Sequence, residues 1–214
     1  MNILESLKWR YATKKFDPQS TLSKEILETL KEAFNLTATS YGLQPIKMLV
    51  IQDRSLREQL VPHAYGQRQI VDASYLLVIC IQKNYGTKNI KDHFELVKKV
   101  RNTPDKILAP YKENLIDTFS KLTSKNVEQN SKFQAYLALG NLLTVCANLQ
   151  VDSCPMGGFK PDKFDTILKL DKRNLQSVLL LPIGKRANDD QMASLKKVRK
   201  PIKESVIEID KTNL

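Results

Sequence analysis

Two short basic segments lie at opposite ends of the chain, each beside the boundary of a predicted element. Residues 10–15 read Arg-Tyr-Ala-Thr-Lys-Lys, and residues 196–200 read Lys-Lys-Val-Arg-Lys. Arginine presents a planar fork of N–H donors and lysine a mobile point charge, a combination that suits a phosphate. Taken singly, each segment is more typical of an exposed helix end or a lysine-rich surface. If the fold brings the two together, they predict a site for the phosphate end of a cofactor.

Two further segments carry groups that suit a flat heterocyclic ligand. Gly157 and Gly158 are the only adjacent glycines, and glycine permits unusual backbone conformations and a close approach of main-chain N–H groups. Gln67 and Gln69 precede a predicted strand, and an amide can donate and accept hydrogen bonds at one edge. Alone, the first is a tight turn and the second a polar loop. Because no Gly-x-Gly-x-x-Gly or Walker-type loop is present, neither Rossmann nor P-loop nucleotide binding is indicated.

The residue types and their spacing offer little support for a metal site or for a catalytic nucleophile. His63 and His93 are far apart and lack acidic neighbours at ligand spacing, so we expect no metal site. Neither histidine lies near a nucleophile-elbow pattern. The three cysteines form no Cys-x-x-Cys pattern and fall in or beside apolar runs, which indicates buried thiols in a reducing compartment. They are Cys80, Cys146 and Cys154.

The composition is that of a globular protein, with 42% hydrophobic and 27% charged residues, and residues 1–214 are predicted to form one domain. No run of about 20 apolar residues occurs and the N-terminus lacks a signal-peptide pattern, so we expect a cytoplasmic protein without membrane contact. The net charge of +11 raises the possibility of nucleic-acid binding. However, the lysines alternate with glutamates in helical segments, and a positive field also attracts phosphorylated small molecules.

Three apolar runs predict strands that position these groups: residues 48–51, 75–81 and 177–181. Since each run is continuously apolar, we expect a central sheet covered by helices on both faces. A helix over residues 2–12 is predicted with Asn2 as its cap, and a second helix begins near Ser23.

The middle and the end of the chain predict less regular features. Residues 90–126 are rich in lysine, and Pro104 and Pro110 are expected to break them into short helices. Residues 131–150 form a helix that is apolar nearly all round, which favours a place in a subunit interface over one in the core. Residues 206–209 read Val-Ile-Glu-Ile and predict a strand. It is either an edge strand of the protein's own sheet or one that pairs with a partner chain.

Together, the motifs resemble those of the FMN-dependent nitroreductase family. The likeness runs from about residue 3 to about residue 209 and is closest to the oxygen-insensitive NAD(P)H nitroreductases and the dihydropteridine reductases. It implies an α+β fold with a central, helix-flanked, mostly antiparallel sheet. It also implies a homodimer with FMN at the interface and an exchanged C-terminal segment. The motifs that carry it lie at residues 10–16, 40–45, 67–74, 155–159, 181–184 and 197–201.

The resemblance assigns each motif a part in holding FMN. The phosphate is gripped by the first and last motifs, here Arg10, Tyr11, Ala12, Lys197 and Arg199. The pyrimidine edge of the flavin faces a lysine and two amides, here Lys14, Gln67 and Gln69. Backbone N–H groups approach flavin N5 and O4 from Gly157 and Gly158. The other subunit supplies Thr39, Ser40 and Gly42, with Tyr41 at the mouth of the substrate site. The aromatic residue that shapes the substrate pocket in the family falls in the variable middle region, and we assign it here to Phe119.

Three positions depart from the family pattern. Ala12 stands where many members have serine, which removes a hydroxyl donor to the phosphate. Gly157 replaces a glutamate, and Gln69 stands where some members use a second lysine. The positive charge that favours reduced flavin therefore falls mainly on Lys14.

The activity implied by the resemblance is a ping-pong reduction. NAD(P)H passes hydride to flavin N5 and leaves, and a nitroaromatic or quinone-like acceptor then takes its place and receives two electrons. The flavin carries the chemistry, and the protein supplies orientation and charge. The alternatives are a dihydropteridine or flavin reductase on the same scaffold and, from a different class, a cofactor-free protein that binds nucleic acid.

Overall fold

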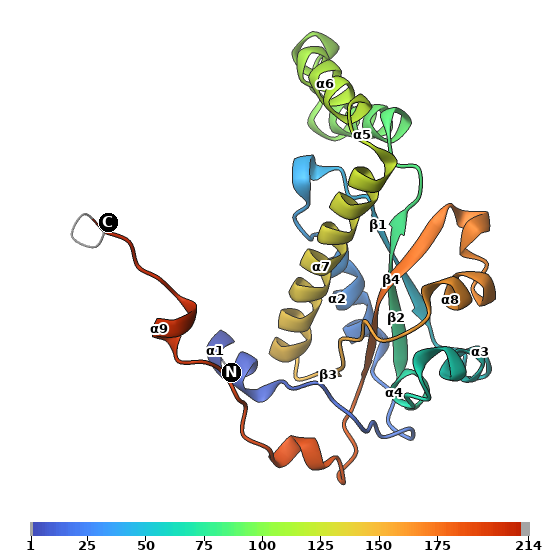
Figure 1. Ribbon diagram of the computed structural model, residues 1–214, viewed down its shortest axis with the longest axis vertical. Helices are drawn as coiled ribbons and strands as arrows, with labels where there is room; N and C mark the ends of the chain where they lie inside the picture. The colour runs from blue at the N-terminus through green and yellow to red at the C-terminus, as the bar shows by residue number, and fades with distance from the viewer. Residues whose placement is uncertain (1, 211–214) are drawn as a thin grey trace.

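The computed structural model describes residues 2–210. The predicted domain boundaries, residues 1 and 214, lie outside this range. At its centre is a four-stranded antiparallel sheet in the order β1-β2-β4-β3 (Figure 1). All three predicted strands are confirmed, and so is the α+β class with an antiparallel sheet. The strands are β1 (Ile46–Ile51), β2 (Tyr75–Gln82), β3 (Asp152–Ser153) and β4 (Leu175–Gly184).

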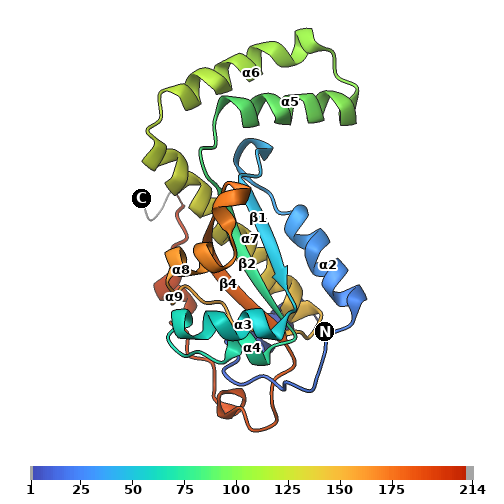
Figure 2. The same cartoon turned by 90° about the vertical axis from the view of Figure 1, so that its right-hand side faces the viewer.

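Helices cover both faces of this sheet (Figures 1 and 2). On one face lie α2 (Lys24–Asn35) and α7 (Ser124–Asn148), and on the other lie α3 (Arg54–Leu60), α4 (Gln69–Asp72) and α8 (Pro161–Ile167). Because side chains alternate along a strand, β2 supplies residues to both cores, which explains its continuously apolar sequence. Its residues facing α2 and α7 are Tyr75, Leu77, Ile79 and Ile81, and those facing the other layer are Leu76, Val78 and Cys80.

The first helix, α1, is shorter than predicted. It spans Ile3–Trp9, with Asn2 as its N-cap as expected, and does not continue to residue 12. Arg10 already has extended backbone angles (φ −66°, ψ 142°). The following segment runs beside β3, where the Thr13 N–H donates to the Ser153 carbonyl oxygen at 3.2 Å. This early end carries the first basic segment out of the helix and along the sheet.

A pair of helices, α5 (Thr87–Arg101) and α6 (Asp105–Ser120), projects from one end of the sheet (Figure 2). Pro104 precedes α6 as predicted, but the predicted break at Pro110 is wrong, because this proline lies inside α6. Proline has no backbone N–H, so a carbonyl in the preceding turn lacks its helical donor. Because Pro110 is exposed, water can donate to that carbonyl instead.

The long helix α7 begins at Ser124, earlier than the predicted residue 131, and Thr123 caps it. One side packs on the sheet through Ala135, Ala138, Leu142 and Cys146, all fully buried. The opposite side leaves Phe133, Tyr136 and Leu137 more than half exposed. The helix therefore belongs to the core on one side and presents an apolar surface on the other. Among the described residues, no helix, α7 included, is long and apolar enough to cross a membrane.

Short helical turns complete the chain. They are the 3-10 turns Ser40–Gly42, Val61–Ala64, Leu170–Arg173 and Gln191–Ser194, and the helix α9 (Ile202–Ser205). After β4 the chain passes α1 and then extends away from the body (Figure 1). Residues 206–209 form no strand, so the reading as an edge strand of the protein's own sheet is wrong. The segment leaves the body beside α1 and does not return to the sheet. Pairing with a partner chain stays a prediction.

Gly184→Ala is expected to lower the free energy of unfolding by about 1–3 kcal/mol, the usual cost of overpacking. An added Cβ would stand 2.9 Å from the Ser74 backbone nitrogen and 3.0 Å from Phe16 Cδ1, and a backbone atom cannot rotate away. Urea unfolding of the cofactor-free protein measures the loss. Gly157→Ala is the matched control, because in the part of the chain that the structure describes no atom lies within 4 Å of its added Cβ. Equal losses in the two variants would contradict the steric argument.

Candidate functional site

The fold brings the two basic segments together. Lys197 Nζ donates to the Leu7 carbonyl oxygen at 2.7 Å and also to the carbonyl oxygen of Arg10. These carbonyls lie at the C-terminal end of α1, where unpaired carbonyl groups attract a cation. Arg199 follows two residues later, close enough for its charge to act on Arg10. We call Arg10, Lys197 and Arg199 the basic cluster.

The basic cluster has the electrostatics of an anion site. Burial, and then the charge of Arg199, lower the pKa of Arg10. Burial also lowers the pKa of Lys197, with further contributions from Arg10 and Arg199. No carboxylate contributes to either shift, and Arg10 Nε is buried without a hydrogen-bond partner among the described residues. Three like charges and an unpaired buried donor are stabilised by a bound anion.

An arginine outside the predicted set holds the end of α1 in place. The guanidinium of Arg186 lies between the rings of Trp9 and Tyr11, at 4.5 and 4.6 Å from their centroids. It also pairs with the buried carboxylate of Asp152 in β3, with Nε 2.6 Å from Oδ1. Because Trp9 and Tyr11 flank Arg10, this stack and ion pair fix the backbone that carries Arg10. No local sequence pattern predicts these contacts, because Arg186 is far along the chain from Trp9 and Tyr11.

Lys14 is held by a second residue that the sequence did not single out. Its backbone N–H donates to Asp190 Oδ2 at 2.9 Å, and the N–H of Lys15 donates to the same oxygen at 3.2 Å. The Tyr11 hydroxyl donates there as well, at 3.0 Å. Burial opposes ionisation of the Asp190 carboxyl, but these bonds and one from the Met192 N–H outweigh it, so the pKa of Asp190 is lowered. The charges of Lys14 and Arg10 both act on the buried Cys154 thiol, which lies on the chain leading to the Gly157 turn.

The Gly-Gly turn lies against the predicted amide loop. Gln67 Nε2 donates to the carbonyl oxygens of Gly158 and Ala64, each at 3.1 Å. Both glycines are exposed, whereas Gln69 is buried as the first residue of α4. Neither glycine has a positive φ, so the turn does not use the left-handed conformations that glycine permits. Gly157 leaves open space instead, since an added Cβ there would meet no atom of the described residues within 4 Å.

The structure does not bring the Thr39–Gly42 loop to the basic cluster. The Ser40 N–H donates to Oε1 of Gln134 in α7 at 2.9 Å, whereas the charge of Arg10 acts on Cys146 further along the same helix. Twelve residues of α-helix separate these two points by about 18 Å along the axis. Within one chain, this loop and Arg10 therefore cannot contact the same small group.

The two predicted substrate residues meet in a pocket beside that loop. The rings of Tyr41 and Phe119 are edge to face, with centroids 6.4 Å apart, and the ring centroid of Tyr85 also lies 6.4 Å from that of Phe119. We call this the aromatic pocket. Its volume is about 380 Å³, and no charged side chain lines it. Its neutral polar groups come from Ser40, Thr118, Asn130, Ser131 and Gln134.

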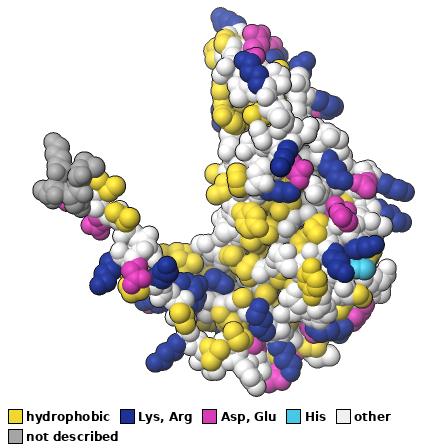
Figure 3. Space-filling model, viewed as in Figure 1, with side chains coloured by type: hydrophobic (Ala, Val, Ile, Leu, Met, Phe, Trp, Pro, Cys, Tyr) yellow, Lys and Arg dark blue, Asp and Glu magenta, His cyan; other side chains and the backbone are white. Residues whose placement is uncertain are grey.

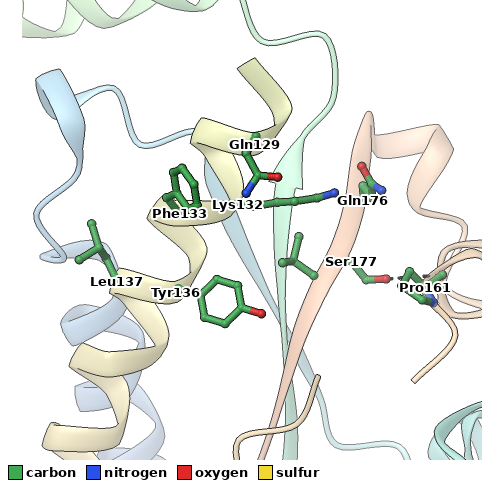
Figure 4. Close-up of a pocket in the computed structure, with 9 residues that line it drawn as sticks. Gln129, Lys132, Phe133, Tyr136, Leu137, Pro161, Gln176 and Ser177 are labelled. Carbon is green, nitrogen blue, oxygen red and sulfur yellow. Dashed lines mark hydrogen bonds between the residues drawn. The ribbon is translucent and has the colours of Figure 1, made fainter. Parts of the chain in front are cut away.

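A larger open groove of about 870 Å³ lies between the exposed side of α7 and the start of β4 (Figure 4). Lys132 and Tyr136 of α7 face Gln176 and Ser177 of β4 across it, and apolar side chains gather over the middle of this surface (Figure 3). None of the residues predicted to hold the cofactor lines this groove. It therefore belongs to the apolar surface of α7 and not to the basic cluster.

Comparison with known proteins agrees with the fold and the motifs. The sequence model of the nitroreductase family matches residues 7–185. A protein of Staphylococcus aureus strain bovine RF122 / ET3-1, provisionally assigned as an NAD(P)H nitroreductase, is 34% identical over 201 residues, 87% of each chain. A nitroreductase-like structure from Streptococcus mutans has a TM-score of 0.84 at 23% identity, covering 97% of this chain and 98% of that one. A provisionally assigned nitroreductase of Exiguobacterium sibiricum, solved in complex with FMN, has a TM-score of 0.83 at 21% identity over 98% of both chains.

These comparisons confirm the resemblance that the motifs indicated. The matched family model spans most of the chain, from α1 to the residue after β4, and the sequence relative reaches across nearly nine-tenths of it. The chain belongs to the nitroreductase family.

Proposed function

We propose that this protein is an FMN-dependent NAD(P)H oxidoreductase that reduces nitroaromatic or quinone-like acceptors. One observation carries the proposal: Arg10, Lys197 and Arg199 converge from the two ends of the chain, and no carboxylate of the described residues pairs with them. FMN ends in a phosphate, which fits an arginine fork and two further cations. The FMN-bound relative from Exiguobacterium sibiricum and the NAD(P)H nitroreductase assignment of the Staphylococcus aureus relative support the same choice.

In this proposal each group holds a different part of the cofactor. The basic cluster binds the phosphate, next to Tyr11 and Ala12. Lys14, Gln67 and Gln69 face the pyrimidine edge, and the N–H groups of Gly157 and Gly158 face the flavin ring where Gly157 leaves room for it. When bound, FMN supplies two-electron transfer from NAD(P)H to the acceptor. The ammonium of Lys14 stabilises the negative charge that the reduced ring carries near N1 and C2=O.

The active protein is a homodimer, because one chain provides only part of this site. Thr39, Ser40 and Gly42 come from the partner, as does the aromatic pocket with Tyr41 and Phe119, since about 18 Å of α7 separates their loop from Arg10 within one chain. The exposed apolar side of α7 suits burial against a second copy. The extended C-terminal segment, with Ile207 84% and Ile209 69% exposed, reaches the partner and pairs with it.

The double substitution Ile207→Asp/Ile209→Asp is expected to raise the dimer dissociation constant at least tenfold. Residues two apart share one face of a strand, and burying one isoleucine contributes about 1.5–3 kcal/mol. Sedimentation over a range of concentrations measures the constant. Val100→Asp, at an equally exposed position on α5, is the control. An unchanged dissociation constant in the double variant would show that the segment does not contribute to the dimer.

Purification and reconstitution test the main proposal. The protein is expected to be yellow or to become so with added FMN, and to oxidise NADH or NADPH when an acceptor is present. Rates with a nitroaromatic, a quinone, a dihydropteridine and free flavin identify the preferred acceptor. A colourless protein that binds RNA and ignores added FMN would overturn the proposal in favour of nucleic-acid binding.

A further inference from the structure

Asp190 joins two segments that are 176 residues apart in the sequence. Its Oδ2 atom accepts hydrogen bonds from the Lys14 N–H, the Lys15 N–H and the Tyr11 hydroxyl, and its Oδ1 atom accepts one from the Met192 N–H. The side chain is buried, with 6% of the residue exposed. Both carboxylate oxygens accept hydrogen bonds from the protein, so the side chain is held rigidly. Exchanging these hydrogen bonds for bonds to water would cost stability.

The neighbouring acid has a different environment. Asp189 is largely exposed, and its one ion pair among the described residues is with the Lys15 ammonium. Exposed pairs of this kind contribute little. The two adjacent aspartates therefore separate two roles: Asp189 binds a side chain at the surface, and Asp190 binds the backbone of the segment beneath it. This contrast supplies a matched control with the same change of charge.

The backbone that Asp190 holds decides where the Lys14 side chain begins. Among the described residues the Lys14 ammonium forms no ion pair, and its charge acts on the Cys154 thiol, at the entry to the Gly157 turn. A lysine side chain is flexible, so its backbone sets the region that the ammonium can reach. The two hydrogen bonds from the Lys14 and Lys15 N–H groups fix the point from which this side chain extends.

We propose that Asp190 is the positioning residue that sets where the Lys14 ammonium stands against the flavin, and that it thereby tunes the flavin's midpoint potential. The inference rests on the proposed function. A cation held near the pyrimidine edge binds reduced flavin more tightly than oxidised flavin and raises the potential. Loss of the Asp190 hydrogen bonds allows Lys14 to move, which weakens that preference.

The sign of the shift in midpoint potential distinguishes a loss of Lys14 positioning from the simple removal of a negative charge. Removing a negative charge near the flavin, with Lys14 in place, would raise the potential. Releasing Lys14 lowers it. Asp190→Asn is therefore expected to lower the ratio of reduced to oxidised FMN affinity about tenfold, the lower limit for a hydrogen bond to a charged group. For a two-electron couple this equals about 30 mV in the negative direction.

The experiment compares Asp190→Asn, Asp190→Glu, Asp189→Asn, Lys14→Met and the double variant Lys14→Met/Asp190→Asn. Spectroscopic redox titration of the FMN-loaded proteins gives the potentials. Hydrogen exchange of the cofactor-free proteins reports whether residues 11–16 lose protection. Asp190→Glu keeps the charge and moves the carboxylate by one methylene, so it isolates positioning and serves if Asp190→Asn fails to fold.

The expected result is faster exchange in residues 11–16 and a more negative potential in both Asp190 variants, with Asp189→Asn unchanged. In the double variant, the loss of Asp190 is expected to lower the potential no further than Lys14→Met alone. A potential that rises or stays constant in the Asp190 variants overturns the inference, and so does an equal shift in Asp189→Asn. A wild-type protein that binds no FMN overturns the proposed function together with the inference, whereas a flavoprotein with an unchanged potential overturns the inference alone.

Discussion

Arg10→Met is expected to weaken FMN binding by about a hundredfold, the loss that follows when one partner of a partly buried charge pair is removed. Arg186 holds the two sequence neighbours of Arg10, so the backbone of this cation is well constrained. Its Nε is buried and has no hydrogen-bond partner among the described residues, so it is available to an anion. The substitution keeps an unbranched side chain without the guanidinium, and it leaves the Arg10 carbonyl that binds Lys197. The fold should therefore persist, and only the anion site is lost.

Riboflavin makes this prediction specific to the phosphate. Riboflavin lacks the phosphate, so its affinity should be the same for the wild-type protein and for Arg10→Met. Fluorescence quenching of either flavin measures the dissociation constants. Lys196→Met is the control, since it removes the same charge from an exposed neighbour of Lys197. A parallel loss of riboflavin and FMN affinity would place Arg10 away from the phosphate.

Lys14→Met is expected to slow reduction of the bound flavin by NAD(P)H about a hundredfold, the usual cost of removing a group that stabilises developing charge. Lys14 is the only lysine that the predicted set places at the pyrimidine edge, because its other two members there, Gln67 and Gln69, are amides. The Lys14 side chain is exposed and its backbone contacts to Asp190 remain, so the unfolding midpoint should not change.

Stopped-flow reduction under single-turnover conditions measures this step without interference from the acceptor. Lys15→Met is the matched control, because Lys15 is adjacent, equally exposed and paired with Asp189 at the surface. We expect the flavin bound to the Lys15→Met control to be reduced at the wild-type rate. If flavin bound to the Lys14 variant were reduced at the wild-type rate, Lys14 would have no catalytic role. The proposal that the protein binds FMN would be unaffected.

The sequence determined the parts of this protein that depend on short stretches of chain. Continuous apolar runs marked the three long strands because each strand is covered on both faces. Asn2 and Ser23 marked two helix starts because their side chains bind the first free N–H groups. The ordered motifs identified the family, since their residue types and spacing are matched together.

Tertiary structure decided everything that joins distant segments. Lys197 reaches the end of α1 across 187 residues, and Asp190 reaches Lys14 across 176, and no local pattern encodes either contact. The polar first turns of α7 hid its start at Ser124, and the exposed Pro110 did not break α6 because solvent can replace the missing hydrogen bond. Residues 206–209 have the composition of a strand but leave the body. Local propensity states which element a segment can form, and only the packing of the whole chain decides which partner it meets.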